Sequence, residues 1–259
     1  MLWMRFLRDG RAGLGRLDGD RIVVHDGDLF DAPRPTGEVL AADAVTWLAP
    51  CEPGIFVCLW NNFHAAAAKQ SLAIPAEPLW VIKGAAALSA HEQPIVAPAP
   101  QVYDGRVVFE GELGIVIGRT CRNVDEAGAA ACVFGYTCVN DVTALELIGR
   151  DPAFAQWTRA KSFEGFGPFG PVIATGLDPM SLTVRTLVGG RERQNYPVSD
   201  IVFPPAQIVS RLSREFTLRA GDVIACGTSV GVLPMRPGQV VEVVIDGIGT
   251  LRNAFRSTP

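Results

Sequence analysis

Short apolar runs bounded by turn residues recur along most of the chain, and this pattern predicts a strand-rich protein. Residues 55–59 are uniformly apolar, which indicates a buried strand. Near the end, two β-branched runs flank Asp246-Gly247, a dipeptide typical of tight hairpin turns. Helical patterns are few and glycines are many, 27 in all, so we expect a mainly β protein of the α+β class with antiparallel pairing.

Helices are expected in a few places only. The alanine-rich segment at residues 61–69 favours a short helix. Further helices are predicted at about residues 125–133 and 204–215. In the last of these, Ile208 and Leu212 recur at helical spacing and, with Phe216, would form one apolar stripe.

The first fifty residues have the pattern of a separate small unit. An Asp18-Gly19 turn precedes the β-branched run that ends at His25, as in a hairpin. Four prolines between residues 33 and 53 then interrupt the chain. We therefore predict a small N-terminal β domain over residues 1–52 and a larger domain over residues 53–259.

One predicted strand carries two acids among apolar residues and glycines. Glu110 and Glu112 lie two positions apart within residues 107–118, so their side chains point to the same face. Like charges repel and burial disfavours ionisation, so the pair is costly unless water or a cation meets it. Mg²⁺, Mn²⁺ and Ca²⁺ take oxygen ligands of this kind. For the pair alone, a solvated face and a metal site both stay open.

Composition and charge narrow the function classes. The chain has 259 residues, of which 48% are hydrophobic and 19% charged, and a formal net charge of −4. It has no block of lysine and arginine, so nucleic acid and anionic membranes are not expected partners. It also has no signal-peptide pattern, no apolar run of membrane-spanning length and no C-x-x-C pair among its six cysteines. We therefore expect a cytoplasmic protein with buried, reduced thiols.

Two more charged residues stand in mostly apolar surroundings. Asp141 follows the apolar segment 135–139, and from a neighbouring strand it could converge with Glu110 and Glu112. Three carboxylates with waters suit Mg²⁺ or Mn²⁺ and leave positions open for a substrate. Lys161 lies in a segment rich in glycine and aromatic residues, where an ordinary surface lysine is the simpler interpretation for this residue alone.

Five sequence blocks, in order over about residues 55–255, together resemble the fumarylacetoacetate hydrolase family. The blocks are Glu110-Gly-Glu112, residues 135–143, Lys161-Ser-Phe-Glu-Gly-Phe-Gly-Pro-Phe-Gly-Pro171, residues 221–228 and residues 238–253. The resemblance implies a mixed β-sandwich roll, a homodimer, and a bound Mg²⁺ or Mn²⁺ that Ca²⁺ can replace.

The same resemblance implies a role for each matching residue. Glu110, Glu112 and Asp141 would bind the metal, and Lys161 would be the catalytic lysine. Gly227 and Thr228 would bind the substrate, and the glycine would let the backbone approach a ligand closely.

The chain departs from the family at positions that bear on the reaction. Members that hydrolyse carbon–carbon bonds commonly carry a histidine and a glutamate that activate water, and ungapped matching puts Ala66 and Lys69 there. His64 stands two residues early, which on a helix rotates it by about 200°. Leu145 stands where the family has an arginine, and Arg150 is the candidate substitute for binding substrate.

We therefore expect a divalent-metal enzyme that acts on 2-oxo acids or their enols from aromatic catabolism. The metal would bind the 2-oxo and carboxylate groups and so stabilise the enolate formed when a proton or CO₂ leaves, with Lys161 moving the proton. Without the histidine–glutamate pair, we favour keto–enol or double-bond isomerisation, or decarboxylation of a 2-oxo-dicarboxylate. Hydrolysis of acylpyruvates or fumarylpyruvate, with His64 as base, is the second interpretation. A non-catalytic protein that binds a metal–oxoacid complex is the third.

Overall fold

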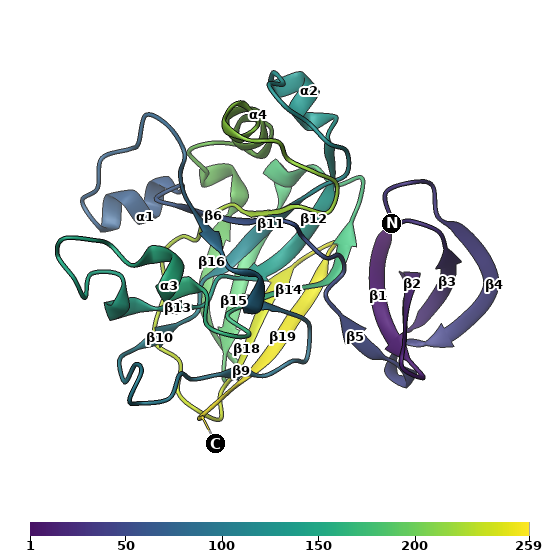
Figure 1. Ribbon diagram of the computed structural model, residues 1–259, viewed down its shortest axis with the longest axis horizontal. Coiled ribbons are helices and arrows are strands. Elements are labelled where there is room, and N and C mark those ends of the chain that lie inside the picture. Colours follow the sequence, from purple (N-terminus) through teal and green to yellow (C-terminus); the bar gives the residue numbers. More distant parts are fainter. Residues whose placement is uncertain (259) are drawn as a thin grey trace.

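The computed structural model describes residues 1–258, and most of its regular structure is β-strand (Figure 1). The 12-stranded sheet runs in the order β4 (Arg34–Ala41), β3 (Arg21–Asp26), β2 (Arg11–Asp18), β1 (Leu2–Arg8), β14 (Gly167–Ala174), β12 (Val133–Asn140), β11 (Gly111–Ile117), β17 (Val223–Ala225), β6 (Phe56–Trp60) and β7 (Leu79–Lys83). Beside this path, β5 (Thr46–Leu48) pairs with β1 and β8 (Leu88–Ser89) pairs with β14.

A second, five-stranded sheet faces the central strands of the first one. Its order is β16 (Arg191–Pro197), β15 (Thr183–Val188), β18 (Val240–Ile245), β19 (Gly249–Arg256) and β9 (Ile95–Val96). A short separate pair consists of β10 (Val107–Val108) and β13 (Thr143–Ala144). The α-helices are α1 (His64–Lys69), α2 (Glu126–Ala130), α3 (Trp157–Lys161) and α4 (Pro205–Glu215).

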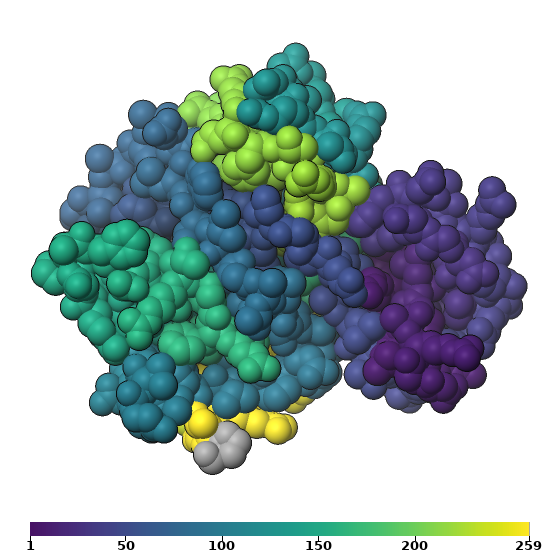
Figure 2. Space-filling model, in the orientation of Figure 1, coloured from purple at the N-terminus to yellow at the C-terminus, as the bar shows by residue number. Residues whose placement is uncertain are grey.

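The N-terminal strands form a lobe beside the larger body. Strands β1 to β4 are an antiparallel meander in chain order. β1 also pairs with β14 of the larger body, with Leu2 opposite Ala174 and Trp3 opposite Ile173. Figure 2 shows the lobe protruding from one side of the molecule. The lobe is therefore joined to the large sheet through its first strand.

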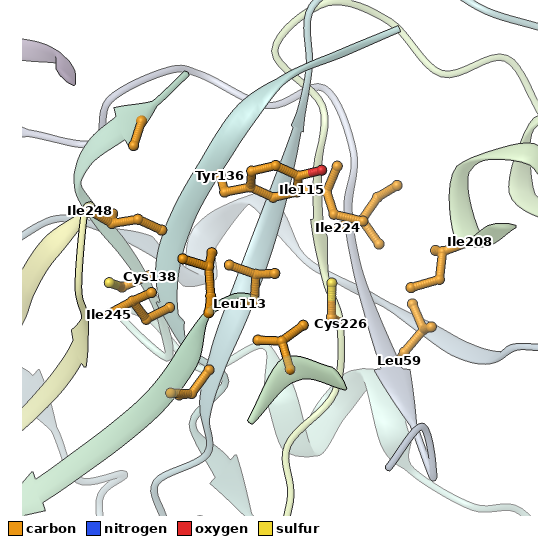
Figure 3. Packing of buried hydrophobic residues seen from close by; sticks show 14 of the residues in the cluster. Leu59, Leu113, Ile115, Tyr136, Cys138, Ile208, Ile224, Cys226, Ile245 and Ile248 are labelled. Carbon is orange, nitrogen blue, oxygen red and sulfur yellow. The ribbon is translucent and has the colours of Figure 1, made fainter. Parts of the chain in front are cut away.

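The main core lies between the two sheets. β11 is buried along its whole length because β12 and β17 flank it and the smaller sheet covers it. Figure 3 shows Leu113 and Ile115 of β11 beside Tyr136 and Cys138 of β12, with Ile245 of the smaller sheet close by. Burying each such aliphatic side chain stabilises the fold by about 1.5–3 kcal/mol. The residues at the start of β11 are thus held on a well-packed strand.

The predicted fold class, a mainly β mixed sandwich roll, is confirmed. The strand expected at residues 55–59 is β6, and the helix expected at 204–215 is α4, whose apolar stripe packs on the core. The alanine-rich segment forms α1. The predicted hairpin around Asp246-Gly247 joins β18 to β19.

Three features differ from the prediction. The strand expected over residues 107–118 is interrupted at Phe109 and Glu110, between β10 and β11. The helix expected to reach residue 133 ends at Ala130, because β12 already begins at Val133. The pairs β6–β17, β8–β14 and β9–β19 are parallel, so the sheets are mixed and not antiparallel throughout.

The cysteines agree with the prediction of buried thiols. Within residues 1–258, all six are buried and free of disulfides. Burial raises the pKa of the Cys51 thiol to about 12, which keeps this group protonated and unreactive near neutral pH. No helix in this part of the chain is long and apolar enough to cross a membrane.

Candidate active site

Three carboxylates meet where the start of β11 lies beside the end of β12. The two strands are antiparallel, with Gly111 opposite Asn140, so the residues next to this pair are close in space. Glu110 and Glu112 flank Gly111, and Asp141 directly follows β12. One oxygen of each carboxylate lies within 4.8 Å of the others. The backbone N–H of Asp141 also donates to the carbonyl of Glu110 at 2.8 Å, which fixes the two residues together.

The carboxylates are largely removed from water. Glu112 and Asp141 are fully buried and Glu110 is partly buried. Burial raises the pKa of Glu112 well above its ordinary value, and the nearby charge of Asp141 adds to this effect. Burial also raises the pKa of Glu110. Glu112 accepts a 2.7 Å hydrogen bond from the Gly227 N–H through Oε2, but its buried Oε1 has no hydrogen-bond partner among residues 1–258.

Two buried lysines compensate part of this negative charge. Lys161, the last residue of α3, donates from Nζ to Glu110 at 2.7 Å, to Thr143 Oγ1 at 2.9 Å, and to Asp141. Lys83, the last residue of β7, places Nζ 2.7 Å from Asp141 Oδ1. Burial alone would raise the pKa of Asp141, but the two ammonium groups outweigh it and hold this pKa below its ordinary value. Burial lowers the pKa of Lys161, and the carboxylates reverse that shift and raise it overall.

These surroundings correct one expectation about Lys161. Its segment, taken alone, favoured an ordinary surface lysine. The residue instead ends a helix and binds Glu110 and Asp141 directly. The reason is that α3 packs against β7 and β13, so that the helix end faces the acids.

The donor set fits a divalent cation. With all five groups ionised, as metal binding requires of the acids, three carboxylates and two ammonium groups leave one negative charge in excess. Hard cations such as Mg²⁺ and Mn²⁺ prefer oxygen ligands, and the unpartnered Oε1 of Glu112 is an oxygen that nothing else in residues 1–258 satisfies. A buried carboxylate oxygen without a partner is costly. Glu110, Glu112 and Asp141 are therefore able to hold such an ion.

The loop after β17 closes the site on one side. Gly227 has a φ of 91°, and a Cβ there would lie 3.2 Å from the carbonyl oxygen of Leu59, so other residues would be strained. Thr228 donates from Oγ1 to the carbonyl of Gly111 at 2.9 Å and accepts from Gln194 Nε2 at 2.8 Å. The predicted substrate-binding pair Gly227-Thr228 thus lies directly against the start of β11.

A cavity of about 370 Å³ opens onto these groups. Its charged lining residues are Lys69, Glu110 and Lys161, and Thr228 also borders it. In the lining described within residues 1–258, Glu110 is the one carboxylate and no histidine is present. A larger cavity of about 740 Å³ lies beside the N-terminal lobe and contains none of the three acids. We assign the site by its chemistry and not by cavity size.

Two of the predicted site residues lie elsewhere. His64 is exposed at the first position of α1 and is absent from the cavity lining within the described chain. Arg150 is also exposed, with its guanidinium 5.6 Å from the centre of the Tyr103 ring. The structure therefore brings together the three acids, Lys161, Gly227 and Thr228, but neither of these two residues.

Three supporting residues could not be predicted from the sequence. Lys83 looks in the sequence like the polar end of an exposed strand, yet it is 2% exposed and pairs with Asp141. Gln194 accepts from the Gly111 N–H at 3.0 Å and Tyr196 donates to the Gly111 carbonyl at 2.6 Å. All three act across long sequence separations, and alternating polar residues on β16 give no signal that two of them point inward.

Lys83 leads to a prediction about stability. Replacing it by methionine (Lys83→Met) keeps the volume but removes one buried partner of Asp141, which is expected to cost about 3–5 kcal/mol. For a chain of this size, that lowers the thermal midpoint by roughly 6–20 °C. Differential scanning calorimetry of Lys83→Met and of the exposed control Lys69→Met measures the difference. Equal midpoints in the two variants would contradict this account of Lys83.

The comparisons with known proteins agree with this geometry. Residues 55–256 match the family model described as fumarylacetoacetate (FAA) hydrolase C-terminal. Residues 1–50 match a second model, described as Rv2993c-like, N-terminal. The chain belongs to the fumarylacetoacetate hydrolase family.

Characterised members of this family differ in their reactions. The structure is similar to that of 2-hydroxyhepta-2,4-diene-1,7-dioate isomerase from Mycobacterium marinum, with a TM-score of 0.90, 33% identity, and coverage of 100% of this chain and 99% of the other. The oxaloacetate tautomerase YisK of Bacillus subtilis is 32% identical over 91% of this chain and 83% of its own. Maleylpyruvate hydrolase from Sphingobium sp. SYK-6, in complex with manganese(II) and pyruvate, matches with a TM-score of 0.81, 25% identity and full coverage of both chains.

Proposed function

We propose that this chain is a divalent-metal-dependent enzyme that interconverts the keto and enol forms, or double-bond isomers, of 2-oxo acids, or decarboxylates a 2-oxo-dicarboxylate. One observation carries the proposal. The cavity beside the three acids has Lys161 as a proton-carrying group, but its lining within residues 1–258 offers no histidine and no carboxylate other than Glu110. Enolisation needs a proton carrier near the substrate, whereas hydrolysis also needs a base that activates water.

Similarity to known proteins supports the same reaction class. Two of the similar proteins are an isomerase of an unsaturated 2-hydroxy diacid and a tautomerase of oxaloacetate. The structure of a third relative contains a manganese ion together with pyruvate, a small 2-oxo acid. These names favour a metal ion and a 2-oxo acid for this site too.

Each residue has a role in the proposed reaction. Glu110, Glu112 and Asp141 hold Mg²⁺ or Mn²⁺, and the ion supplies positive charge that favours enolisation of a 2-oxo acid. Lys161 borders the cavity, and one of its three N–H groups, now directed at Glu110, Asp141 and Thr143, would turn to the substrate oxygen once the acids bind the ion. It would pass a proton to C3 and take up the enol hydroxyl proton in return, so the lysine ends as an ammonium again. The side chain of Thr228, in the loop after β17, contacts the substrate carboxylate.

Cleavage of carbon–carbon bonds is the second candidate, favoured by the similarity to maleylpyruvate hydrolase. A positioned general base contributes about 10² to 10⁴ in rate, and Ala66 at the family's histidine position supplies none. We therefore expect cleavage of acylpyruvates to be weak, and unchanged in His64→Ala because His64 is exposed away from the cavity. Rapid acetylpyruvate cleavage with Mg²⁺ that collapses in His64→Ala would establish the hydrolase. Binding of the substrate without any turnover would instead indicate a non-catalytic protein.

A further inference from the structure

We infer that Lys69 binds the second carboxylate of a 2-oxo-dicarboxylate and so selects dicarboxylates over monocarboxylic 2-oxo acids. This inference rests on the proposed function and names the substrate class of the same site. It assigns a binding role to a position where the family's hydrolases have a catalytic acid.

The charges of the cavity point to Lys69. Within residues 1–258, the positively charged side chains of its lining are Lys69 and Lys161. Lys161 already donates to Glu110, Asp141 and Thr143. Lys69 forms no ion pair with any described residue, so it is the cation of the lining that is free to meet an anionic ligand.

The local fold directs this lysine to the cavity. Lys69 ends α1, and the preceding Ala66 and Ala67 are buried, so the helix packs closely on the core. Asn62, just before the helix, donates from Nδ2 to the carbonyl of Cys226 at 2.8 Å. This bond ties the start of α1 to the strand that leads into Gly227. The helix end and the substrate loop thereby border one cavity.

The remaining wall cannot recognise a second carboxylate by charge. Much of it is apolar, and its polar side chains, Asn61, Gln70, Thr228 and Ser229, are uncharged. The apolar part includes Leu145, Ile148, Trp157, Val230 and Val232. In particular, Leu145 occupies the position at which the family has an arginine, so this position supplies no positive charge. A carboxylate placed against these residues would lose its hydration without a partner, which is costly. Its favourable position is therefore at Lys69, beside the amide of Gln70.

The size of the cavity agrees with a short substrate. Its volume of about 370 Å³ lies at the small end of the roughly 300–1,000 Å³ typical of ligand sites. A cavity of this size favours a 2-oxo-dicarboxylate with few carbons between its two carboxylates.

The test compares two substrates of the same shape. Oxaloacetate ends in a carboxylate, and 4-methyl-2-oxopentanoate has an isopropyl group of similar size in its place. Exchange of the C3 protons in D₂O with the diamagnetic ion Mg²⁺, followed by NMR, gives kcat and KM for both in the wild type, Lys69→Gln and Lys69→Arg. Calorimetric titration of the Mn²⁺-loaded proteins with both compounds gives a readout that does not depend on turnover.

We expect Lys69→Gln to raise KM and Kd for oxaloacetate about tenfold. This factor is at the lower end of what a hydrogen bond to a charged group contributes, because Lys69 is exposed. Its kcat should change little, the values for 4-methyl-2-oxopentanoate should stay the same, and Lys69→Arg should restore most of the oxaloacetate affinity. Equal changes for both compounds, or no change for either, would overturn the inference. If the wild type binds oxaloacetate in a Lys69-dependent way but exchanges no proton, the proposed function fails while the binding role stands.

Discussion

The double substitution Glu110→Gln with Glu112→Gln is expected to abolish turnover, by about a thousandfold or more, while the chain stays folded. The two glutamates supply two of the three carboxylates that are placed to hold a divalent cation. An ion in such a position contributes several kcal/mol to stabilising charge in the transition state, and each 1.36 kcal/mol corresponds to a factor of ten in rate. The amides keep the volume of the side chains but lose their charge.

The same variant has a readout that is independent of activity. Without metal, we expect its thermal midpoint to lie close to that of the wild type, because relief of the buried like charges around Glu112 offsets loss of the Lys161–Glu110 ion pair. Mn²⁺ should raise the midpoint of the wild type and leave that of the variant unchanged. A matched control is Glu77→Gln with Glu215→Gln, at two exposed positions. Turnover that persists in the Glu110/Glu112 variant and remains sensitive to EDTA would contradict the metal assignment.

Replacing Lys161 by methionine (Lys161→Met) is expected to reduce turnover by about a hundredfold or more, in the range for one general acid or base. Lys161 borders the cavity, and its Nζ is the proton-carrying atom nearest the acids that are placed to bind the ion. Lys161→Ala should reduce turnover by a similar factor. Metal binding should persist, because the three carboxylates remain.

Loss of a buried ion pair complicates this experiment, and Lys83→Met controls for it. Lys83 pairs with the same Asp141 but is absent from the cavity lining that the described residues form. The loss of turnover per folded molecule in Lys83→Met therefore measures how much of the lost activity comes from breaking a buried ion pair with Asp141. Turnover per folded molecule should fall much further in Lys161→Met. Near-normal turnover in Lys161→Met, with metal still bound, would show that Lys161 only supports the structure.

The sequence predicted the acid cluster better than its surroundings. Alternation along a strand predicts that Glu110 and Glu112 share one face, and their carboxylates do lie within 4.8 Å of each other although β11 begins only at Gly111. The approach of Asp141 follows from antiparallel pairing of neighbouring strands. Lys83 and the partners of Lys161 could not be predicted in this way, because β7 and α3 reach Asp141 through tertiary packing and not through strand alternation or strand pairing.

Other predictions depended on the resemblance more than on physical pattern. His64 was a candidate because it stands near the expected histidine in sequence, but a helix turns a residue away within two positions, and His64 is exposed. Arg150 was a candidate for similar reasons and lies against Tyr103. The homodimer, the cytoplasmic location and the link to aromatic catabolism stay predictions.

Deuterium incorporation at C3 of oxaloacetate, followed by NMR in D₂O and set beside acetylpyruvate cleavage under the same conditions, tests the proposed enolisation directly. We predict exchange well above the background rate, dependent on Mg²⁺ and lost in the Glu110/Glu112 variant, with cleavage much slower. Cleavage that outpaces exchange, or exchange that is unaffected by EDTA, would contradict it.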